Sequence, residues 1–336
     1  MEACAPSKVI LFGEHAVVYD KLGISAAVSL YSKSFVKRFE GNSIRIVDKR
    51  LNLEEEWDKP ELFKLKSEIE GLIENERYAD LKNISKKDIF APIKYLLGTF
   101  IESYGFEPLK IEIESEIPMA SGLGSGSSLF ASVILSVLDF YQKKFEREEI
   151  SKMTYDADVI AHGGTPSGID NNTVVYGGYI SFRKSLGIEP LKISKKIPMI
   201  IGNTNIPSNT SEMVLRVRRF LEKFPEKFSL LDEIDEISHL ALRAIERGNH
   251  ERIGELMNEN HKILEQLEVS CPMIEKLCKA ARDAGALGAK LTGAGGGGNM
   301  IAIGYEKKEI SSAISKAGGK AYMTEMGVSG VSLVKE

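Results

Sequence analysis

The stretch IPMASGLGSGSS, residues Ile117–Ser128, joins a predicted strand to a predicted helix. Apolar and charged residues alternate through Leu109–Ile117, with the two-residue period of a strand. Leu129–Tyr141 is apolar nearly all round, as expected of a buried helix. The sequence therefore predicts a strand, a glycine-rich turn and a helix N-terminus in succession.

This turn has the chemistry of a phosphate site. Gly122, Gly124 and Gly126 have no side chains, so the backbone can pass close to a ligand. The serines of the same stretch add hydroxyl and capping groups, and the helix start adds unpaired N–H groups and a positive dipole end. The alternative is a serine-glycine turn that only caps a core helix.

Length and composition exclude several protein classes. The 336 residues, 43% of them hydrophobic, allow one large domain or two ordinary ones. A net charge of -4 without a basic block argues against a nucleic-acid partner. Three scattered cysteines predict neither a disulfide framework nor a usual zinc pattern. The sequence has no signal-peptide pattern and no apolar run of ~20 residues, so we expect no membrane span and a cytoplasmic protein.

The N-terminal stretch KVILFGEHAVVY, Lys8–Tyr19, places the polar pair Glu14-His15 between two apolar runs. We interpret both runs as strand, the second being Ala16–Val18. A glutamate inside a core strand is expensive to bury without a partner. The stretch is therefore either a surface hairpin or a site where Lys8, Glu14 and His15 converge on a polar ligand.

Residues 40–90 are the most polar and least regular part of the chain, and we interpret them as a lid-like insertion with one helix, Glu61–Glu76. Trp57 in this part either lines an adenine pocket or packs in the core. An amphipathic helix, Ile89–Ser103, precedes the strand before the glycine-rich turn.

A second polar loop, HGGTPSGIDN, follows a predicted helix at Glu148–Ala161 and precedes a predicted strand at Thr173–Phe182. A carboxylate held by a rigid loop is a good general base, which makes Asp170 a catalytic candidate. The alternative is a turn-forming aspartate that opens the strand.

The remaining pattern is helix-rich and does not alternate regularly with strands, which indicates a two-lobed α+β chain. The further helices are expected at Ser211–Phe220, Leu230–Arg247, His250–Leu267 and Pro272–Ala284, and the further strands at Pro198–Asn203, Ala286–Leu291, Asn299–Gly304, Ala321–Glu325 and Val328–Val334.

The stretch KLTGAGGGGN, Lys290–Asn299, contains a literal G-x-G-x-x-G match that we reject. That dinucleotide fingerprint must open a helix, whereas a strand follows here, and the Walker phosphate loop is also missing from the sequence. We predict a second glycine loop that packs against the first, near the same ligand.

In this order the motifs resemble those of the GHMP kinase superfamily and, within it, the mevalonate kinases. The matching segments are APSKVILFGEH, P-x-x-x-GLGS, TPSGIDN and KLTGAGGGG, which together span residues 5–298. The segments GEHAVVY and PSGIDN are more similar to mevalonate kinases than to galactokinases or phosphomevalonate kinases.

The resemblance implies a two-domain GHMP kinase fold of the α+β class. Residues 1–180 would form a ribosomal-protein-S5-like domain that binds ATP, and residues 181–336 a ferredoxin-like domain. ATP and mevalonate would meet between them, and the γ-phosphoryl group would pass to the 5-hydroxyl of mevalonate in the mevalonate route to isoprenoids. Mg²⁺ would accompany ATP, and a homodimer is a candidate assembly.

The resemblance also implies roles for particular residues. Asp170 would be the catalytic carboxylate and Lys8 its ion-pair partner, with Glu14, His15 and Thr210 on the mevalonate side. The ATP-binding residues would be Pro118, Gly122, Leu123, Gly124, Ser125, Gly126, Ser127 and Ser128. Gly295, Gly296, Gly297 and Gly298 would support the phosphate loop.

The chain departs from the family pattern at the metal site and beside the substrate. Gly126 separates two serines that the family usually has together, and Asp158 stands where a glutamate is usual. We therefore expect Ser125 or Ser127, with Asp158, to hold the metal. Ser208-Asn209 replaces a basic residue common before the threonine aligned with Thr210.

Two other functions remain open. The first is a GHMP kinase acting on phosphomevalonate, homoserine or a sugar. The second is a catalytically silent ligand-binding relative, against which the presence of both Lys8 and Asp170 argues.

Overall fold

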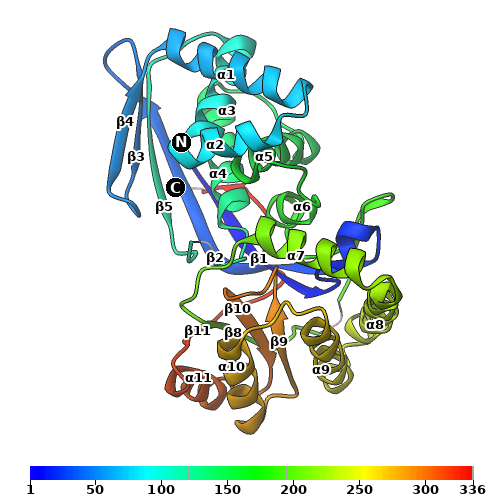
Figure 1. Cartoon of the computed structure of the whole chain (residues 1–336). Coiled ribbons are helices and arrows are strands. Elements are labelled where there is room, and N and C mark those ends of the chain that lie inside the picture. Colours follow the sequence, from blue (N-terminus) through cyan, green and yellow to red (C-terminus); the bar gives the residue numbers. More distant parts are fainter. Residues whose placement is uncertain (120, 194, 335–336) are drawn as a thin grey trace.

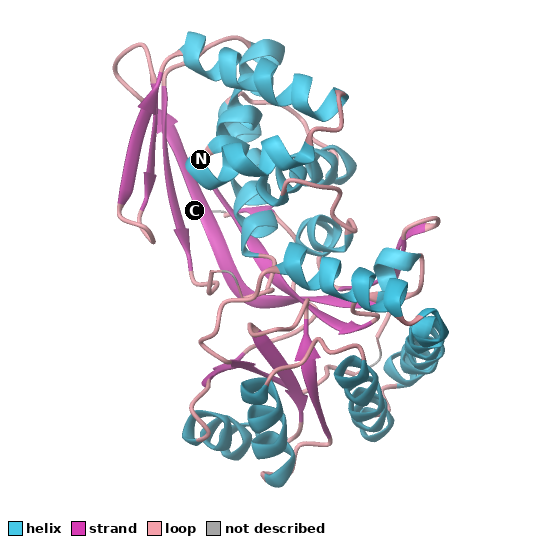
Figure 2. Cartoon of the chain, in the orientation of Figure 1, coloured by secondary structure: helices cyan, strands magenta, loops and turns pink. Residues whose placement is uncertain are grey.

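The computed structural model describes residues 1–119, 121–193 and 195–334 and consists of two β-sheets with helices packed on them (Figures 1 and 2). The larger sheet, drawn at the top left in Figure 1, is built mainly from the first half of the chain. The smaller sheet lies below it and comes from the second half. This is the two-domain α+β arrangement that the sequence predicts.

The larger sheet has the order β12-β1-β2-β5-β3-β4, with β6 paired to β2 and β7 to β6. Only the β3–β5 pair is parallel among the pairs described. Its strands are β1 (Glu2–Phe12), β2 (Gly23–Arg38), β3 (Ile44–Asp48), β4 (Leu53–Trp57), β5 (Leu109–Ser115), β6 (Tyr179–Arg183), β7 (Gly187–Leu191) and β12 (Ser332–Leu333). The helices cover one face of this sheet (Figure 2). That is why β5 buries Ile111 and Ile113 but leaves Glu112 partly exposed.

The helical layer on this sheet centres on α4, in which every residue from Ser127 to Leu138 is buried. The predicted buried helix is therefore confirmed. The layer comprises α1 (Lys59–Glu74), α2 (Tyr78–Lys87), α3 (Ala91–Tyr104), α4 (Ser125–Phe140), α5 (Arg147–His162) and α6 (Ile169–Tyr176), and a short 3-10 helix, η1 (Ala16–Tyr19), follows β1.

The smaller sheet is fully antiparallel in the order β11-β8-β10-β9. Its strands are β8 (Met199–Asn203), β9 (Gly288–Thr292), β10 (Asn299–Ile303) and β11 (Lys320–Met323). The helices are α7 (Thr210–Lys223), η2 (Pro225–Phe228), α8 (Ser229–Arg247), α9 (His250–Gln266), α10 (Pro272–Asp283) and α11 (Lys307–Lys316). Along the chain, β8 is followed by helices, then by β9 and β10, then by α11 and β11. This is the βαββαβ order of a ferredoxin-like domain, as expected.

One hydrophobic core joins the two sheets. Val9 and Leu11 of β1 belong to the same buried cluster as Ile201 of β8 and Ile301 of β10. The candidate site residues described below lie along this junction, because β1 and the end of β9 meet there.

The region 40–90 contains two strands and two helices, not the single helix predicted, while its description as a lid-like insertion stays a prediction. β3 and β4 extend the larger sheet, and two helices, α1 and α2, follow them. In β3 the buried Ile44 and Ile46 alternate with half-exposed residues, which is a strand pattern. The pattern was missed because it is only five residues long. Trp57 is 2% exposed and packs edge-on against Phe90, so packing is its role.

Two further predictions about local structure were wrong. The apolar run after His15 is the 3-10 helix η1 and not a strand. Residues 173–176 belong to α6, and the strand begins only at Tyr179. The run Thr173–Val175 has strong strand propensity, but burial among β1, β2 and α4 favours the helix, which Gly177 ends with a positive φ of 74°.

The sheets do not divide the chain cleanly at residue 180. β7 belongs to the larger sheet, and near the C-terminus β12 returns to pair with β1. α11 and β7 were not predicted, and β12 is shorter than the expected strand 328–334. The division into domains remains a proposal, and strand pairing favours boundaries at about 195 and 324.

Candidate active site

Lys8 and Asp170 form an ion pair, with 2.8 Å between Nζ and Oδ1. Lys8 lies on β1 and is 3% exposed, while Asp170 is 34% exposed in the first turn of α6. The positive end of the helix dipole therefore stabilises the negative charge of this carboxylate. The two residues predicted to do the chemistry meet, with the lysine buried and the carboxylate open to a ligand.

The glycine-rich loop lies directly on this lysine. The backbone N–H of Lys8 donates to the carbonyl of Leu123 at 3.0 Å. A Cβ atom on Gly124 would lie 2.9 Å from Cγ of Lys8, and Gly124 has a φ of +68°. Only glycine fits this position without strain.

Gly124 is also the N-cap of α4, so this position has no side chain to satisfy the first N–H groups of the helix. These donors and the dipole end can receive a phosphate group. Ser125 opens the helix. Ser128, predicted to bind ATP, turns its hydroxyl to the carbonyl of Ala5 at 2.8 Å and so ties α4 to β1.

Ser127 and Asp158 form the oxygen-rich part of the site. The Ser127 hydroxyl donates to Oδ2 of Asp158 at 2.7 Å, and Asp158 is 2% exposed. Burial raises the pKa of Asp158 to about 8, and the charge of Asp170 acts in the same direction. Oδ1 of Asp158 has no hydrogen-bond partner among the described residues. A hydroxyl and an unsatisfied carboxylate oxygen are suitable ligands for Mg²⁺.

The second glycine loop packs against the first, as predicted. A Cβ on Gly293 would lie 3.3 Å from the carbonyl oxygen of Gly122, and one on Gly298 only 2.6 Å from that of Ser121. Asn299 donates from Nδ2 to the same Ser121 oxygen at 2.6 Å. A Cβ on Gly295 would lie 2.0 Å from the carbonyl oxygen of Val269, one on Gly296 2.7 Å from Sδ of Met213, and one on Gly297 2.7 Å from the carbonyl oxygen of Ile206. A side chain at any of these glycines would push the second glycine loop away from the segments that it packs against.

Glu14 and His15 lie deeper than the sequence suggested. Glu14 is 1% exposed and forms an ion pair with Lys290, while Nδ2 of Asn260 donates to its other oxygen at 3.2 Å. Nε2 of His15 donates to the carbonyl of Ala294 at 2.9 Å. Burial lowers the pKa of His15 to about 4, so the ring is neutral at pH 7. The surface hairpin is therefore excluded.

Thr210 is exposed at the first position of α7. The turn before it reaches the glycine loop, because the Ser208 hydroxyl donates to the carbonyl of Gly295 at 2.6 Å. The sequence did not identify Lys290 and Asn260 as site residues. Lys290 begins the stretch KLTGAGGGGN, but nothing in the local sequence indicates that its ammonium binds the carboxylate of Glu14, 276 positions away.

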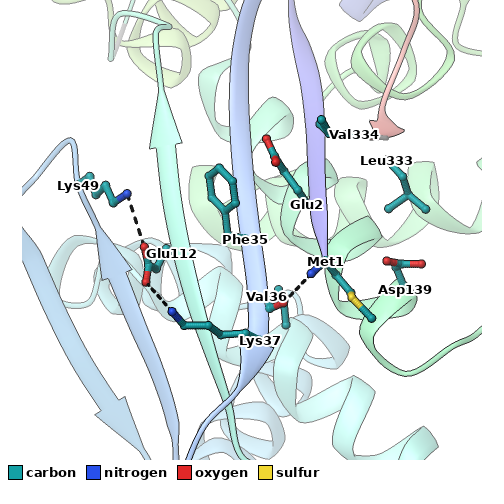
Figure 3. A pocket seen from close by; sticks show the side chains of 10 residues that line it. All are labelled: Met1, Glu2, Phe35, Val36, Lys37, Lys49, Glu112, Asp139, Leu333 and Val334. Atoms are coloured by element: carbon teal, nitrogen blue, oxygen red, sulfur yellow. Dashed lines mark hydrogen bonds and ion pairs between the residues drawn. The ribbon is translucent and has the colours of Figure 1, made fainter. Parts of the chain in front are cut away.

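A cavity with a volume of about 650 Å³ lies elsewhere, at the N-terminal end of β1 on the larger sheet (Figure 3). Lys37 and Lys49 both pair with Glu112 there, at 3.6 and 3.5 Å. Seven residues of extended strand, roughly 23 Å, separate Met1 from Lys8. The cavity is therefore not part of the ion-pair site. In the described parts of the chain, no helix combines the length and apolar character needed to cross a bilayer.

Comparison with known proteins identifies the family. The pattern described as GHMP kinases N terminal domain matches residues 92–178, and GHMP kinases C terminal matches residues 241–322. The mevalonate kinase of Thermococcus gammatolerans is 34% identical over 338 residues, covering 98% of this chain and 97% of its own.

Solved structures agree with this. The crystal structure of the Methanococcus jannaschii mevalonate kinase superimposes with a TM-score of 0.83 at 28% identity, covering 97% of this chain and 98% of that one. The L. major mevalonate kinase in complex with R-mevalonate gives a TM-score of 0.76 at 25% identity, covering 98% and 97%.

Proposed function

This chain belongs to the GHMP kinases and, within them, to the mevalonate kinase family, and from that membership we propose that it transfers the γ-phosphoryl group of ATP to the 5-hydroxyl of mevalonate. The product is 5-phosphomevalonate. The observation that carries the proposal is the Lys8–Asp170 pair, which lies against the glycine loop at the start of α4.

In the proposed mechanism Asp170 accepts the proton of the acceptor hydroxyl, because its carboxylate is the exposed member of the pair. Lys8 holds that carboxylate in place and adds positive charge beside the transferred group. Gly122–Ser127 and the start of α4 receive the triphosphate. Phosphoryl transfer needs little more than this positioning and charge stabilisation.

Ser127 and Asp158 are the residues proposed to hold Mg²⁺, with Ser125 as a further hydroxyl. Their support is the unsatisfied Oδ1 atom of Asp158 beside the phosphate loop. When bound, the ion would neutralise charge on the β- and γ-phosphates. Gly126 cannot contribute a side-chain ligand.

The acceptor is proposed to lie beside the Gly13–His15 turn and Thr210. The mevalonate complex of the L. major relative supports mevalonate as the occupant. Direct contacts from Glu14 and His15 remain a prediction, since their polar groups already bind Lys290, Asn260 and Ala294. A homodimer likewise remains a proposal, which light scattering tests.

A coupled ADP-release assay with mevalonate, phosphomevalonate, homoserine and galactose tests the function. We expect mevalonate to be preferred by a large margin in kcat/KM. Preference for another alcohol would assign a different GHMP kinase activity. ATP binding without turnover on any of the four would indicate a silent relative, despite the complete Lys8–Asp170 pair.

A further inference from the structure

The turn that carries Glu14 and His15 is strained and needs external support. Gly13 has a φ of +93°, and His15, which is not a glycine, has a φ of +62°. A non-glycine residue in this region is destabilised by crowding around its Cβ atom, and it persists only where the surroundings hold it. The question is therefore what holds this turn.

The support comes from three alternate residues of a single segment, Lys290, Thr292 and Ala294. Lys290 and Thr292 are alternate residues of β9 (Gly288–Thr292) and therefore lie on one side of the strand, and Ala294 follows in the loop after it. Nζ of Lys290 binds the carboxylate of Glu14, and the carbonyl of Ala294 accepts from His15. Between them, Oγ1 of Thr292 accepts from the N–H of Ile10 at 3.0 Å and donates to its carbonyl at 2.9 Å. We call these three residues the β9 clamp.

Lys290 is the charged member of the clamp and is 0% exposed. Its ammonium also donates to the carbonyl of Leu291 at 2.8 Å and lies 5.9 Å from the centroid of the Phe12 ring. It thus contacts residues on both sides of Gly13. Burial lowers the pKa of Lys290, which the charge of Glu14 opposes.

A buried ion pair is a poor device for stability alone, because desolvation of both charges offsets their attraction, and apolar pairs of similar size do as well. Its advantage is geometric, since charged hydrogen bonds fix two groups in one arrangement. Here they join β9 to the turn five residues after Lys8 on the same run of chain.

We propose that Lys290 is a positioning residue for the acceptor side of the active site, acting through Glu14 as part of the β9 clamp. In this arrangement Glu14 acts by fixing the Gly13–His15 turn, whether or not it also contacts the substrate. The kinetic part of this inference rests on the proposed function, whereas the structural part does not.

The first test removes both charges together, so that neither is left buried alone. The double variant Glu14→Gln/Lys290→Met should exchange the backbone amides of residues 13–19 roughly tenfold faster than wild type. Its KM for mevalonate should rise about tenfold or more, while its KM for ATP stays within about twofold. The single variant Lys290→Met should melt at a lower temperature than the double variant.

Lys94→Met is the matched control. Lys94 is also a buried lysine, paired with Asp88 and Glu55, but it lies in the helical layer on α3. This variant should lose melting temperature and leave both the exchange of residues 13–19 and the mevalonate KM unchanged.

Thr292 gives a milder test that does not disturb any charge. Thr292→Val removes the hydroxyl and keeps the shape, so it should raise exchange and mevalonate KM in the same direction, and Thr292→Ser should restore both. Unchanged exchange in the double variant and in Thr292→Val overturns the proposal, as does an equal rise in both KM values. If the variants show these exchange differences but the wild-type protein does not phosphorylate mevalonate, the proposed function is refuted and the clamp remains supported.

Discussion

The proposed chemistry of this protein rests on the Lys8–Asp170 pair. In the proposed mechanism the 3%-exposed lysine anchors the carboxylate, and the 34%-exposed carboxylate faces the ligand. Asp170→Asn keeps the size of the side chain and removes its charge. We expect kcat to fall by ~10²–10⁴, as for loss of a general base.

Binding of a non-hydrolysable ATP analogue, measured by calorimetry, is the control for Asp170→Asn and should be nearly unchanged. Near-normal turnover in the folded variant would remove Asp170 from the catalytic role.

Asp158 is expected to determine how much Mg²⁺ the enzyme needs. Its carboxylate is buried against Ser127 with one oxygen unsatisfied. Asp158→Ala should raise the Mg²⁺ concentration for half-maximal rate by ~10-fold or more, and far more than it raises the mevalonate KM. Ser127→Ala should act in the same direction. If Mg²⁺ dependence is unaffected by Asp158→Ala, Asp156 becomes the next candidate ligand.

His15 is expected to make the free energy of unfolding depend on pH. Its pKa is lowered from 6.5 to about 4 by burial, so below pH 6.5 the unfolded chain binds a proton that the folded chain does not. Stability is therefore complete above pH 6.5 and is lost as pH falls toward 4, by on the order of 3 kcal/mol. Denaturant unfolding of wild type and His15→Asn across this range measures the effect. An equal loss in both proteins would contradict it.

The junction of β1, the glycine loop and α4 acts as a unit, because α4 begins where the loop crosses Lys8. Gly124→Val places a β-branched side chain at a φ of +68°, 2.9 Å from Lys8 at its Cβ. We expect it to abolish nucleotide binding, as measured by calorimetry with an ATP analogue.

Gly178→Val controls for backbone strain in this test. Gly178 has a nearly equal φ of +66°, but a Cβ there would meet nothing within 4 Å. This variant should lose some stability and keep its nucleotide affinity. If Gly124→Val binds the ATP analogue as tightly as wild type, the loop does not bind nucleotide and only caps α4.

At the largest scale, the two sheets share one core, and the C-terminal segment returns to the first sheet. β12 pairs Leu333 with Ala3, and the N–H of Val331 donates to the carbonyl of Val174 at 3.0 Å. A chain ending at Met323 should therefore lose melting temperature by about 5 °C or more and still unfold in one transition. A circular-dichroism melt that matches wild type would contradict this.

The local patterns were sufficient for most of the site. Glycine spacing and the strand-to-helix order predicted the glycine-rich turn at the start of α4. Polar residues among apolar ones marked Lys8 and Glu14, and a polar loop marked Asp170. These features are readable because glycine, charge and apolar period each restrict the backbone or its surroundings locally. The resemblance to the GHMP kinases added the expected role of each residue, and comparison with known proteins confirmed the family.

The rest depended on residues far apart in the chain. Residues 173–176 are helical despite their strand propensity because β1, β2 and α4 surround them. Glu14 is buried because Lys290 and Asn260 reach it from β9 and α9. The sequence alone determined which residues carry charge and where the backbone can turn. Only the tertiary structure decided which charges meet, because pairing across more than 200 positions leaves no local period.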